Sequence, residues 1–93
     1  MHYYVRLSPE IRSEMTRLSL FLKQKIKDSL KELQNDFFLG KPLIDELEGF
    51  RSYPVSHHRI IYTIEGGKRE IAVAMIAPRF EVYELLLGKK ARA

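Results

Sequence analysis

The first third of the chain changes from an alternating to a helical pattern of hydrophobic positions. Residues 2–7 alternate and have one apolar face, formed by Tyr3, Val5 and Leu7, which predicts a first β-strand. Ser8-Pro9-Glu10 then predicts a helix start, because serine caps helices, proline suits the first helical position and an acid favours the first turn. Apolar residues follow at helical spacing in two runs, separated by a break near Ser19: Ile11, Met15 and Leu18, then Leu22, Ile26, Leu30 and Leu33.

The second half of the chain returns to strand-like alternation. Asn35-Asp36 ends the second helical run, and a connector with several helix-breaking residues leads to Gly49. Three further strands are predicted, at roughly 50–56, 57–64 and 69–77. Gly66-Gly67 between the last two predicts a hairpin turn, because glycine tolerates the positive φ angles of tight hairpins. A short helix or tail is expected from about Glu81 to Leu87.

These elements predict a single α+β domain over residues 1–93. We expect the N-terminal strand and a two-helix hairpin to pack on an antiparallel sheet of about four strands, followed by a short C-terminal helix or tail. A chain of 93 residues is long enough for one modest core and too short for two domains.

The alternation of the last two strands predicts which face of the sheet carries a site. Six apolar residues are expected to lie beneath the helices: Ile60, Tyr62, Ile64, Ile71, Val73 and Met75. The opposite face then holds Arg59 beside the small side chains of Ala72 and Ala74, a shallow concavity that suits a phosphodiester. Alternatively, Arg59 only pairs with a surface acid such as Glu70, and such exposed pairs contribute little to stability. The spacing leaves both interpretations open.

A second arginine strengthens the interpretation as a phosphate site. Arg79 follows directly where the last strand ends at Pro78, and two guanidinium groups brought together on a sheet form a site for phosphate. The formal charge of +4 and the pI near 9.5 favour a polyanionic partner, either nucleic acid or an acidic protein.

The composition argues against several other classes of protein. The chain has no cysteine, and its three histidines lack the spacing of a helical metal site, so neither a metal nor another cofactor is expected. Charged residues interrupt the N-terminal segment, and no run approaches the roughly 20 apolar residues that span a bilayer. We therefore expect a cytoplasmic protein without a membrane partner.

Four segments together resemble the RelE/ParE superfamily of toxins from toxin–antitoxin systems. They are YYVRLSPEI, GKPLIDELEGFRSY, HRIIYTIE and PRFEVYELL, and they span most of the chain in the order of that family. The resemblance implies a ribosome-dependent endoribonuclease that cleaves mRNA by attack of the ribose 2′-hydroxyl on the adjacent phosphate and leaves a cyclic phosphate. By position, it assigns catalytic roles to Arg59, Arg79 and Tyr83.

One segment departs from the pattern of active relatives. Where the resemblance implies basic residues, the chain has Pro54 and Ser56 on the face expected to hold Arg59. Proline donates no ladder hydrogen bond, so Pro54 predicts a sheet edge or a bulge. On the same face His57 is a candidate catalytic base, because histidine titrates near neutral pH; the alternative is an exposed polar residue. Further candidates for RNA contacts are Arg51, His58 and Lys41.

The resemblance therefore leaves three functions open. The first is a ribosome-dependent mRNA endonuclease that is neutralised by a cognate antitoxin. The second is a ParE-like inhibitor of DNA gyrase, which the neutral Pro54 and Ser56 favour. The third is a degenerate member that binds its antitoxin without nuclease activity. In each case the expected partner is an antitoxin segment that is disordered until it binds, and the antitoxin complex is a candidate for binding operator DNA.

Overall fold

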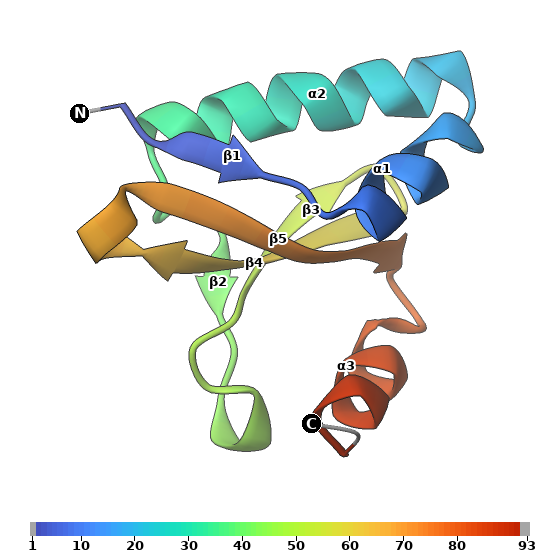
Figure 1. Cartoon of the computed structure of the whole chain (residues 1–93). Helices are drawn as coiled ribbons and strands as arrows, with labels where there is room; N and C mark the ends of the chain where they lie inside the picture. Colours follow the sequence, from blue (N-terminus) through green and yellow to red (C-terminus); the bar gives the residue numbers. More distant parts are fainter. Residues whose placement is uncertain (1, 92–93) are drawn as a thin grey trace.

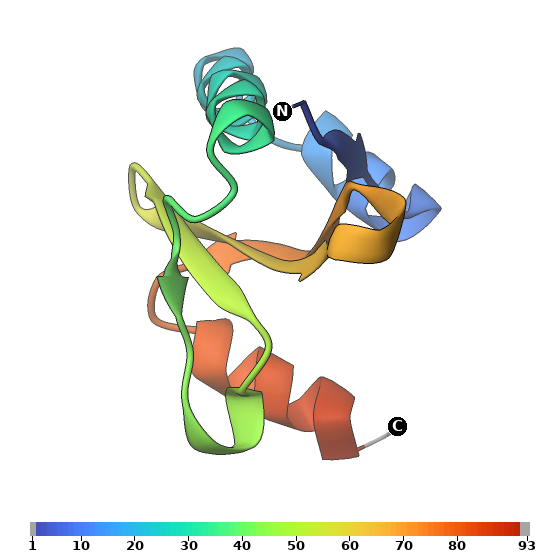
Figure 2. The same ribbon diagram turned by 90° about the vertical axis from the view of Figure 1, so that its left-hand side faces the viewer.

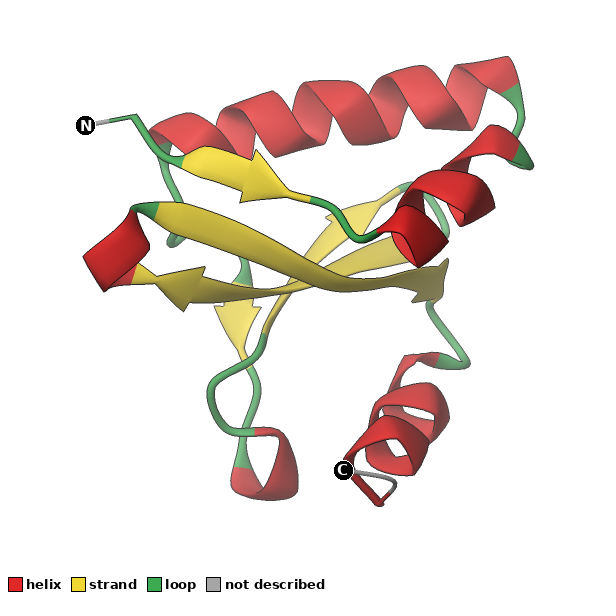
Figure 3. Cartoon of the chain, viewed as in Figure 1, coloured by secondary structure: helices red, strands yellow, loops and turns green. Residues whose placement is uncertain are grey.

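The computed structural model of the chain describes residues 2–91, in which helices cover both faces of one sheet (Figure 1). Helices α1 and α2 lie on one face and α3 lies on the other, as the side view shows (Figure 2). The elements in chain order are β1 (Tyr4–Arg6), α1 (Pro9–Thr16), α2 (Leu20–Asn35), β2 (Lys41–Pro42), η1 (Asp45–Leu47), β3 (Arg51–Val55), β4 (His58–Glu65), η2 (Gly66–Lys68), β5 (Glu70–Pro78) and α3 (Val82–Ala91), where η is a 3-10 helix (Figure 3).

The strand order β1-β5-β4-β3-β2 confirms the α+β fold and corrects one detail of the sheet. The sheet has five strands, and β1 runs parallel to β5 while the other neighbours are antiparallel. The two helices carry the chain from β1 to the far edge of the sheet, and four antiparallel strands return it. Strand β2 runs opposite to β1, and three reversals from β2 bring β5 back beside β1 in the same direction, so the sheet is mixed rather than antiparallel throughout.

Helices α1 and α2 begin at the serines that the sequence indicates. The hydroxyl oxygen of Ser8 accepts a hydrogen bond from the backbone N–H of Ile11 at 3.1 Å, and Ser19 caps Leu22 in the same way at 3.2 Å. Such caps each contribute about 1 kcal/mol, because they satisfy a backbone donor that has no partner within the helix. The break near Ser19 is therefore the start of α2.

The larger core lies between the helices and the sheet. Its buried members come from all layers, as the alternation predicts: Tyr3, Ile11, Met15, Ile26, Leu30, Leu33, Val55, Ile60, Tyr62, Ile71 and Val73. Complete burial of one such aliphatic side chain contributes about 1.5–3 kcal/mol. This core fixes which face of β3 and β4 is turned away from the helices.

A bulge in β5 reverses the predicted direction of Met75. Ile61 is the partner of Met75 whereas Tyr62 is the partner of Val73, so β5 has one additional residue, Ala74, between those pairs. An extra residue inverts the alternation beyond it. Met75 therefore joins a second, smaller core under α3, and the prediction that it faces α1 and α2 was wrong. That second core consists of Leu47, Ile61, Met75, Ala77, Val82 and Leu86.

The two hairpin turns also differ from expectation. Ser56 and His57, which the alternation assigns to strands, form the turn between β3 and β4, and Ser56 has φ +57°. The turn at Gly66-Gly67 is present as η2, but its left-handed residue is Arg69, with φ +54°. In both turns a residue other than glycine takes the positive φ, which composition alone does not indicate.

The connector between α2 and β2 is held by the buried hydroxyl of Tyr62. That side chain is fully buried; its hydroxyl donates to the carbonyl of Phe37 at 2.8 Å and accepts from the N–H of Gly40 at 3.0 Å. Arg51 fastens the same segment from outside, donating to the carbonyl oxygens of Gly40 at 3.0 Å and Phe38 at 3.1 Å. These bonds set the position of β2 at the edge of the sheet.

None of the helices within residues 2–91 has the length and apolar character needed to cross a membrane.

Replacing Gly40 with alanine is expected to destabilise the fold by about 1–3 kcal/mol, because the new methyl group has no room. A Cβ at Gly40 would lie 2.6 Å from the hydroxyl oxygen of Tyr62, whereas a Cβ at Gly67 meets nothing within 4 Å. Urea denaturation of Gly40→Ala and of the control Gly67→Ala measures the difference. Equal midpoints in the two variants would contradict the close packing at Gly40.

Candidate functional site

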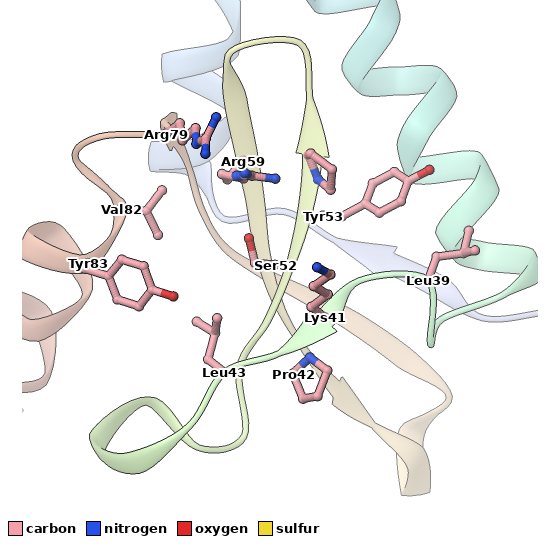
Figure 4. A pocket seen from close by; sticks show the side chains of 11 residues that line it. Leu39, Lys41, Pro42, Leu43, Ser52, Tyr53, Arg59, Arg79, Val82 and Tyr83 are labelled. Atoms are coloured by element: carbon pink, nitrogen blue, oxygen red, sulfur yellow. The ribbon is translucent and has the colours of Figure 1, made fainter.

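A pocket of about 580 Å³ opens where β2, β3 and β4 face the first turn of α3 (Figure 4). It lies mainly on the side of the sheet away from α1 and α2, beside the smaller core, and at the edge of β3 it is bordered by Tyr53, whose ring points toward α2. Eleven residues line it: Leu39, Lys41, Pro42, Leu43, Ser52, Tyr53, Pro54, Arg59, Arg79, Val82 and Tyr83.

The two predicted arginines meet at one end of this pocket. Arg59 is the cross-strand partner of Pro54 and Ala77 and is half-buried. Arg79 follows β5, and its backbone N–H donates to the carbonyl of His57 at 2.9 Å, which ties the segment to the β3–β4 turn. Figure 4 shows both guanidinium groups at the same end. The structure thus brings together the two cations that the sequence places on separate strands.

The alternative interpretation, in which Arg59 pairs with Glu70, was wrong. Glu70 lies at the other end of β5, where its carboxylate accepts from the Nε of Arg6 at 2.9 Å. Arg6 also reaches Glu65 at 3.2 Å. Within residues 2–91 no ion pair involves Arg59, and its charge faces the pocket.

The third predicted residue, Tyr83, enters the pocket from the first turn of α3. Its neighbour Val82 is buried in the smaller core and anchors that turn. Tyr83 itself is 60% exposed, and Figure 4 shows its hydroxyl directed across the pocket toward β3. A ring in this position can stack on a base, and its hydroxyl can reach a bound phosphate.

Tyr53 forms part of the pocket wall, a role that sequence reasoning missed. Its hydroxyl donates to the carboxylate of Glu32 on α2 at 3.3 Å. Burial, and secondarily the charge and hydrogen bond of Glu32, raise the pKa of the Tyr53 phenol above its ordinary value. The phenol therefore stays protonated at neutral pH and cannot serve there as a base. The contact spans two elements, so no local pattern indicates it.

Lys41 enters the pocket from the edge strand β2. Its Cα partner is Ser52, and Figure 4 shows the lysine side chain rising between β2 and β3 into the hollow. Lys41 is exposed and lies across the pocket from the two arginines. Lys41 therefore lines the pocket, and an RNA contact at this position stays a prediction.

The other three candidates lie outside the pocket. His57 is in the exposed turn and does not share the strand face of Arg59, so the physical basis for proposing it as a base is lost. His58 is paired with the buried Val55 and lies on the face toward the helices. The guanidinium group of Arg51 donates hydrogen bonds to the carbonyl oxygens of Gly40 and Phe38 in the connector, and it lies 5.1 Å from the centre of the Phe38 ring. Arg51 is therefore a structural residue in this fold.

Pro54 lies at a free edge of the sheet, as its missing N–H predicts. Strand β2 pairs only with Arg51 and Ser52, so β3 has no outer neighbour from Tyr53 onward in the part of the chain that the structure describes. On the outer side of β3, the carbonyl oxygen of Phe50 accepts a hydrogen bond from the N–H of Leu43. Because backbone groups alternate in direction along a strand, the nitrogen of Pro54 points to the same outer side. Because proline cannot donate there, the edge is protected against strand addition.

The pocket is strongly asymmetric in charge. Its lining contains three cations and no carboxylate among the described residues. No group of three or more histidine or acidic residues within the described chain is arranged to hold a metal ion. Like charges facing one hollow attract an anion with several oxygens. The arrangement is suited to a phosphate group and, through its apolar walls, to the base or sugar attached to it.

Comparisons with known proteins agree on one family. Residues 5–83 match the sequence profile described as the ParE toxin of the type II toxin–antitoxin system parDE. A segment of 53 residues is 36% identical to Toxin RelE of Mycobacterium tuberculosis. That segment is 57% of this chain and 55% of the relative, so the match spans about half the length of that curated protein.

Solved structures share the fold at low sequence identity. The chain is similar to one in the toxin–antitoxin complex RelBE2 from Mycobacterium tuberculosis, with a TM-score of 0.77 and 22% identity over 85% of this chain and 100% of that one. It is similar to the isolated E. coli RelE toxin, with a TM-score of 0.71 and 16% identity over 94% and 97%. For the YoeB/ParE toxin from Agrobacterium tumefaciens the TM-score is 0.68, with 22% identity over 85% and 99%.

Removing the carboxylate of Glu32 is expected to lower the pKa of Tyr53. The pKa of the Tyr53 phenol is raised in the folded chain. Its contribution to the free energy of unfolding is therefore complete below the ordinary pKa of about 10, and it is lost as pH rises through the native pKa. In Glu32→Gln the phenol should ionise at lower pH. Alkaline titration of phenolate absorbance, with Tyr53→Phe subtracted, measures the shift, and Glu14→Gln on the exposed face of α1 is the control. An unchanged titration in Glu32→Gln would refute the contact.

Proposed function

The chain belongs to the ParE toxin family of type II toxin–antitoxin systems, within the RelE/ParE superfamily, and we propose that it is a ribosome-dependent mRNA endonuclease. The observation that carries this proposal is the convergence of Arg59, Arg79 and Tyr83 in one pocket without a carboxylate. These three residues are the ones to which the sequence resemblance assigns catalytic roles, and they come from β4, the loop after β5, and α3.

In the proposed reaction the 2′-hydroxyl of one nucleotide attacks the phosphate that follows it. The O2′–P bond forms and the P–O5′ bond breaks, which leaves a 2′,3′-cyclic phosphate and a 5′-hydroxyl. The 2′ proton is given up to solvent, and the leaving oxygen takes up a proton. Negative charge grows on the phosphorus oxygens in the transition state, and Arg59 and Arg79 stabilise it by charge-assisted hydrogen bonds. Tyr83 stacks on a neighbouring base and fixes the attacking geometry.

The same pocket offers a physical reason for dependence on the ribosome. Its described lining has no imidazole and no carboxylate, and Tyr53 remains protonated. The protein therefore contributes charge stabilisation and little base catalysis. A flexible RNA in solution rarely aligns its 2′-oxygen with the leaving oxygen, whereas mRNA held in the decoding site is already ordered. We infer that cleavage requires this external positioning, which places the toxin in the cytoplasm with the ribosome.

The proposed regulatory partner is a cognate antitoxin. The net charge of +4 suits an acidic segment. The exposed large apolar side chains include Leu20 and Phe21 at the start of α2 and Phe80 before α3. Exposed apolar groups of this size are typical of protein interfaces. A segment that folds onto them would cover the toxin, and the resulting complex is a candidate for binding operator DNA.

A second candidate function rests on β3. The strand contributes only neutral side chains to the pocket, namely Ser52, Tyr53 and Pro54. This fits a ParE-like inhibitor of DNA gyrase, in which the pocket would not act on RNA. A degenerate toxin that binds only its antitoxin would also tolerate these residues. Experiment separates the three.

The endonuclease proposal predicts that Arg59→Ala and Arg79→Ala each lower the rate of ribosome-dependent mRNA cleavage about 10²–10³-fold, as expected for loss of one stabilising donor. The measurement is cleavage of a defined mRNA on purified ribosomes, with the ends mapped at codon resolution. The control Arg17→Ala removes an exposed arginine that caps α1, far in sequence from the pocket.

Three results would contradict the proposal. Intact mRNA with loss of supercoiling activity would identify gyrase as the target. Normal growth when the chain is expressed without an antitoxin would identify a degenerate member. Equal losses in Arg17→Ala and in the pocket variants would mean that the arginines act through general stability.

A further inference from the structure

The pocket has cations on two walls that belong to different parts of the sheet. Arg59 lies near the start of β4, Arg79 follows directly after β5, and Lys41 lies on β2 (Figure 4). The strand between them, β3, gives the pocket no charge within the described lining. Lys41 is therefore the only cation on its side of the pocket among the described lining residues.

The register of the sheet directs Lys41 into the same hollow as Arg59. Lys41 pairs with Ser52, and Ser52 pairs with Ile61, whose side chain lies in the smaller core under α3. Cross-strand partners project to the same face, so Lys41 shares the face that carries Arg59. Two strand spacings and a two-residue offset separate their Cα atoms, about 12 Å, which two long side chains span from opposite sides of a phosphate.

The backbone around Lys41 is fixed more firmly than is usual for an exposed edge. The preceding Gly40 donates to the buried hydroxyl of Tyr62 at 3.0 Å and accepts from Arg51 at 3.0 Å. The following Pro42 has a restricted φ angle. No ion pair to Lys41 occurs within residues 2–91. A lysine held by its neighbours but without a protein partner is preorganised for an external anion.

We propose that the ammonium group of Lys41 contacts the scissile phosphate from the side opposite the arginines, and so supplies from β2 the cation that β3 lacks. This inference rests on the proposed function, since it completes the charge around the same phosphate. Three cations then surround the phosphorus oxygens, and the charge that develops in the transition state is shared among them.

The register supplies a direct test, because Lys41 and its partner Ser52 can be exchanged. Lys41→Ser alone is expected to lower the single-turnover rate of mRNA cleavage on ribosomes about a hundredfold. Adding Ser52→Lys returns a cation to the same face one strand away and should recover most of that loss. The control Lys27→Ser removes an exposed lysine of α2 that does not line the pocket, and this variant should cleave at the wild-type rate.

A second readout is independent of cleavage. Binding of a short single-stranded RNA, followed by fluorescence anisotropy at several salt concentrations, gives the slope of log K against log salt. Loss of one phosphate contact in Lys41→Ser should reduce the steepness of that slope by about 0.7. The exchanged variant should restore it, which a merely structural role of Lys41 would not do.

The outcomes separate the two proposals. If the wild-type chain cleaves mRNA and Lys41→Ser matches it in rate and slope, the role of Lys41 is overturned and the endonuclease proposal stands. If all variants are folded by circular dichroism and the exchange recovers nothing, Lys41 does not act through its charge. If the wild-type chain does not cleave on ribosomes, the endonuclease proposal fails, and the salt slope alone decides whether Lys41 meets a phosphate.

Discussion

The buried hydroxyl of Tyr62 is the interaction on which the rest of the site depends. It bonds to Phe37 and Gly40, which lie at the two ends of the connector that leads the chain from α2 to the sheet edge. If that hydroxyl were absent, a carbonyl and an N–H would lose their partner inside the protein, at about 1–3 kcal/mol each. The same bonds place β2, and β2 forms one wall of the pocket. A residue in the larger core thus determines the shape of a cavity on the other face.

The sequence predicted features that depend on local patterns. The two serine caps, the two helices, the buried faces of β3 and β4 and the convergence of Arg59 with Arg79 follow from periodicity and from the resemblance to a family. Features that depend on one extra residue in a strand, or on contacts between distant residues, could not be predicted from the sequence. The bulge at Ala74 inverts the alternation of β5 without any glycine or proline to mark it. The turn at Ser56-His57 removes His57 from the strand, and only the pairing register reveals this.

The departure at Pro54 leaves β3 without a charge toward the pocket, where the family resemblance implies basic residues. The neighbouring strand β2 pairs with only two residues of β3, and its lysine stands at the rim of the hollow. The neutral strand and the cationic neighbour therefore form one arrangement. Resemblance by aligned position does not register such a replacement, because the two residues belong to different strands.

Because the described lining of the pocket contains no carboxylate, the stability of the fold depends on whether an anion occupies the pocket. Three positive groups around one hollow repel each other, and this repulsion raises the free energy of the unbound folded state. A polyanion that binds only the folded chain removes the repulsion and adds its binding free energy by mass action. A chain that holds such a polyanion is then more stable than the unbound protein. In a cell, proteases and chaperones that sample unfolded chains would shorten the lifetime of free molecules and spare those that hold a ligand.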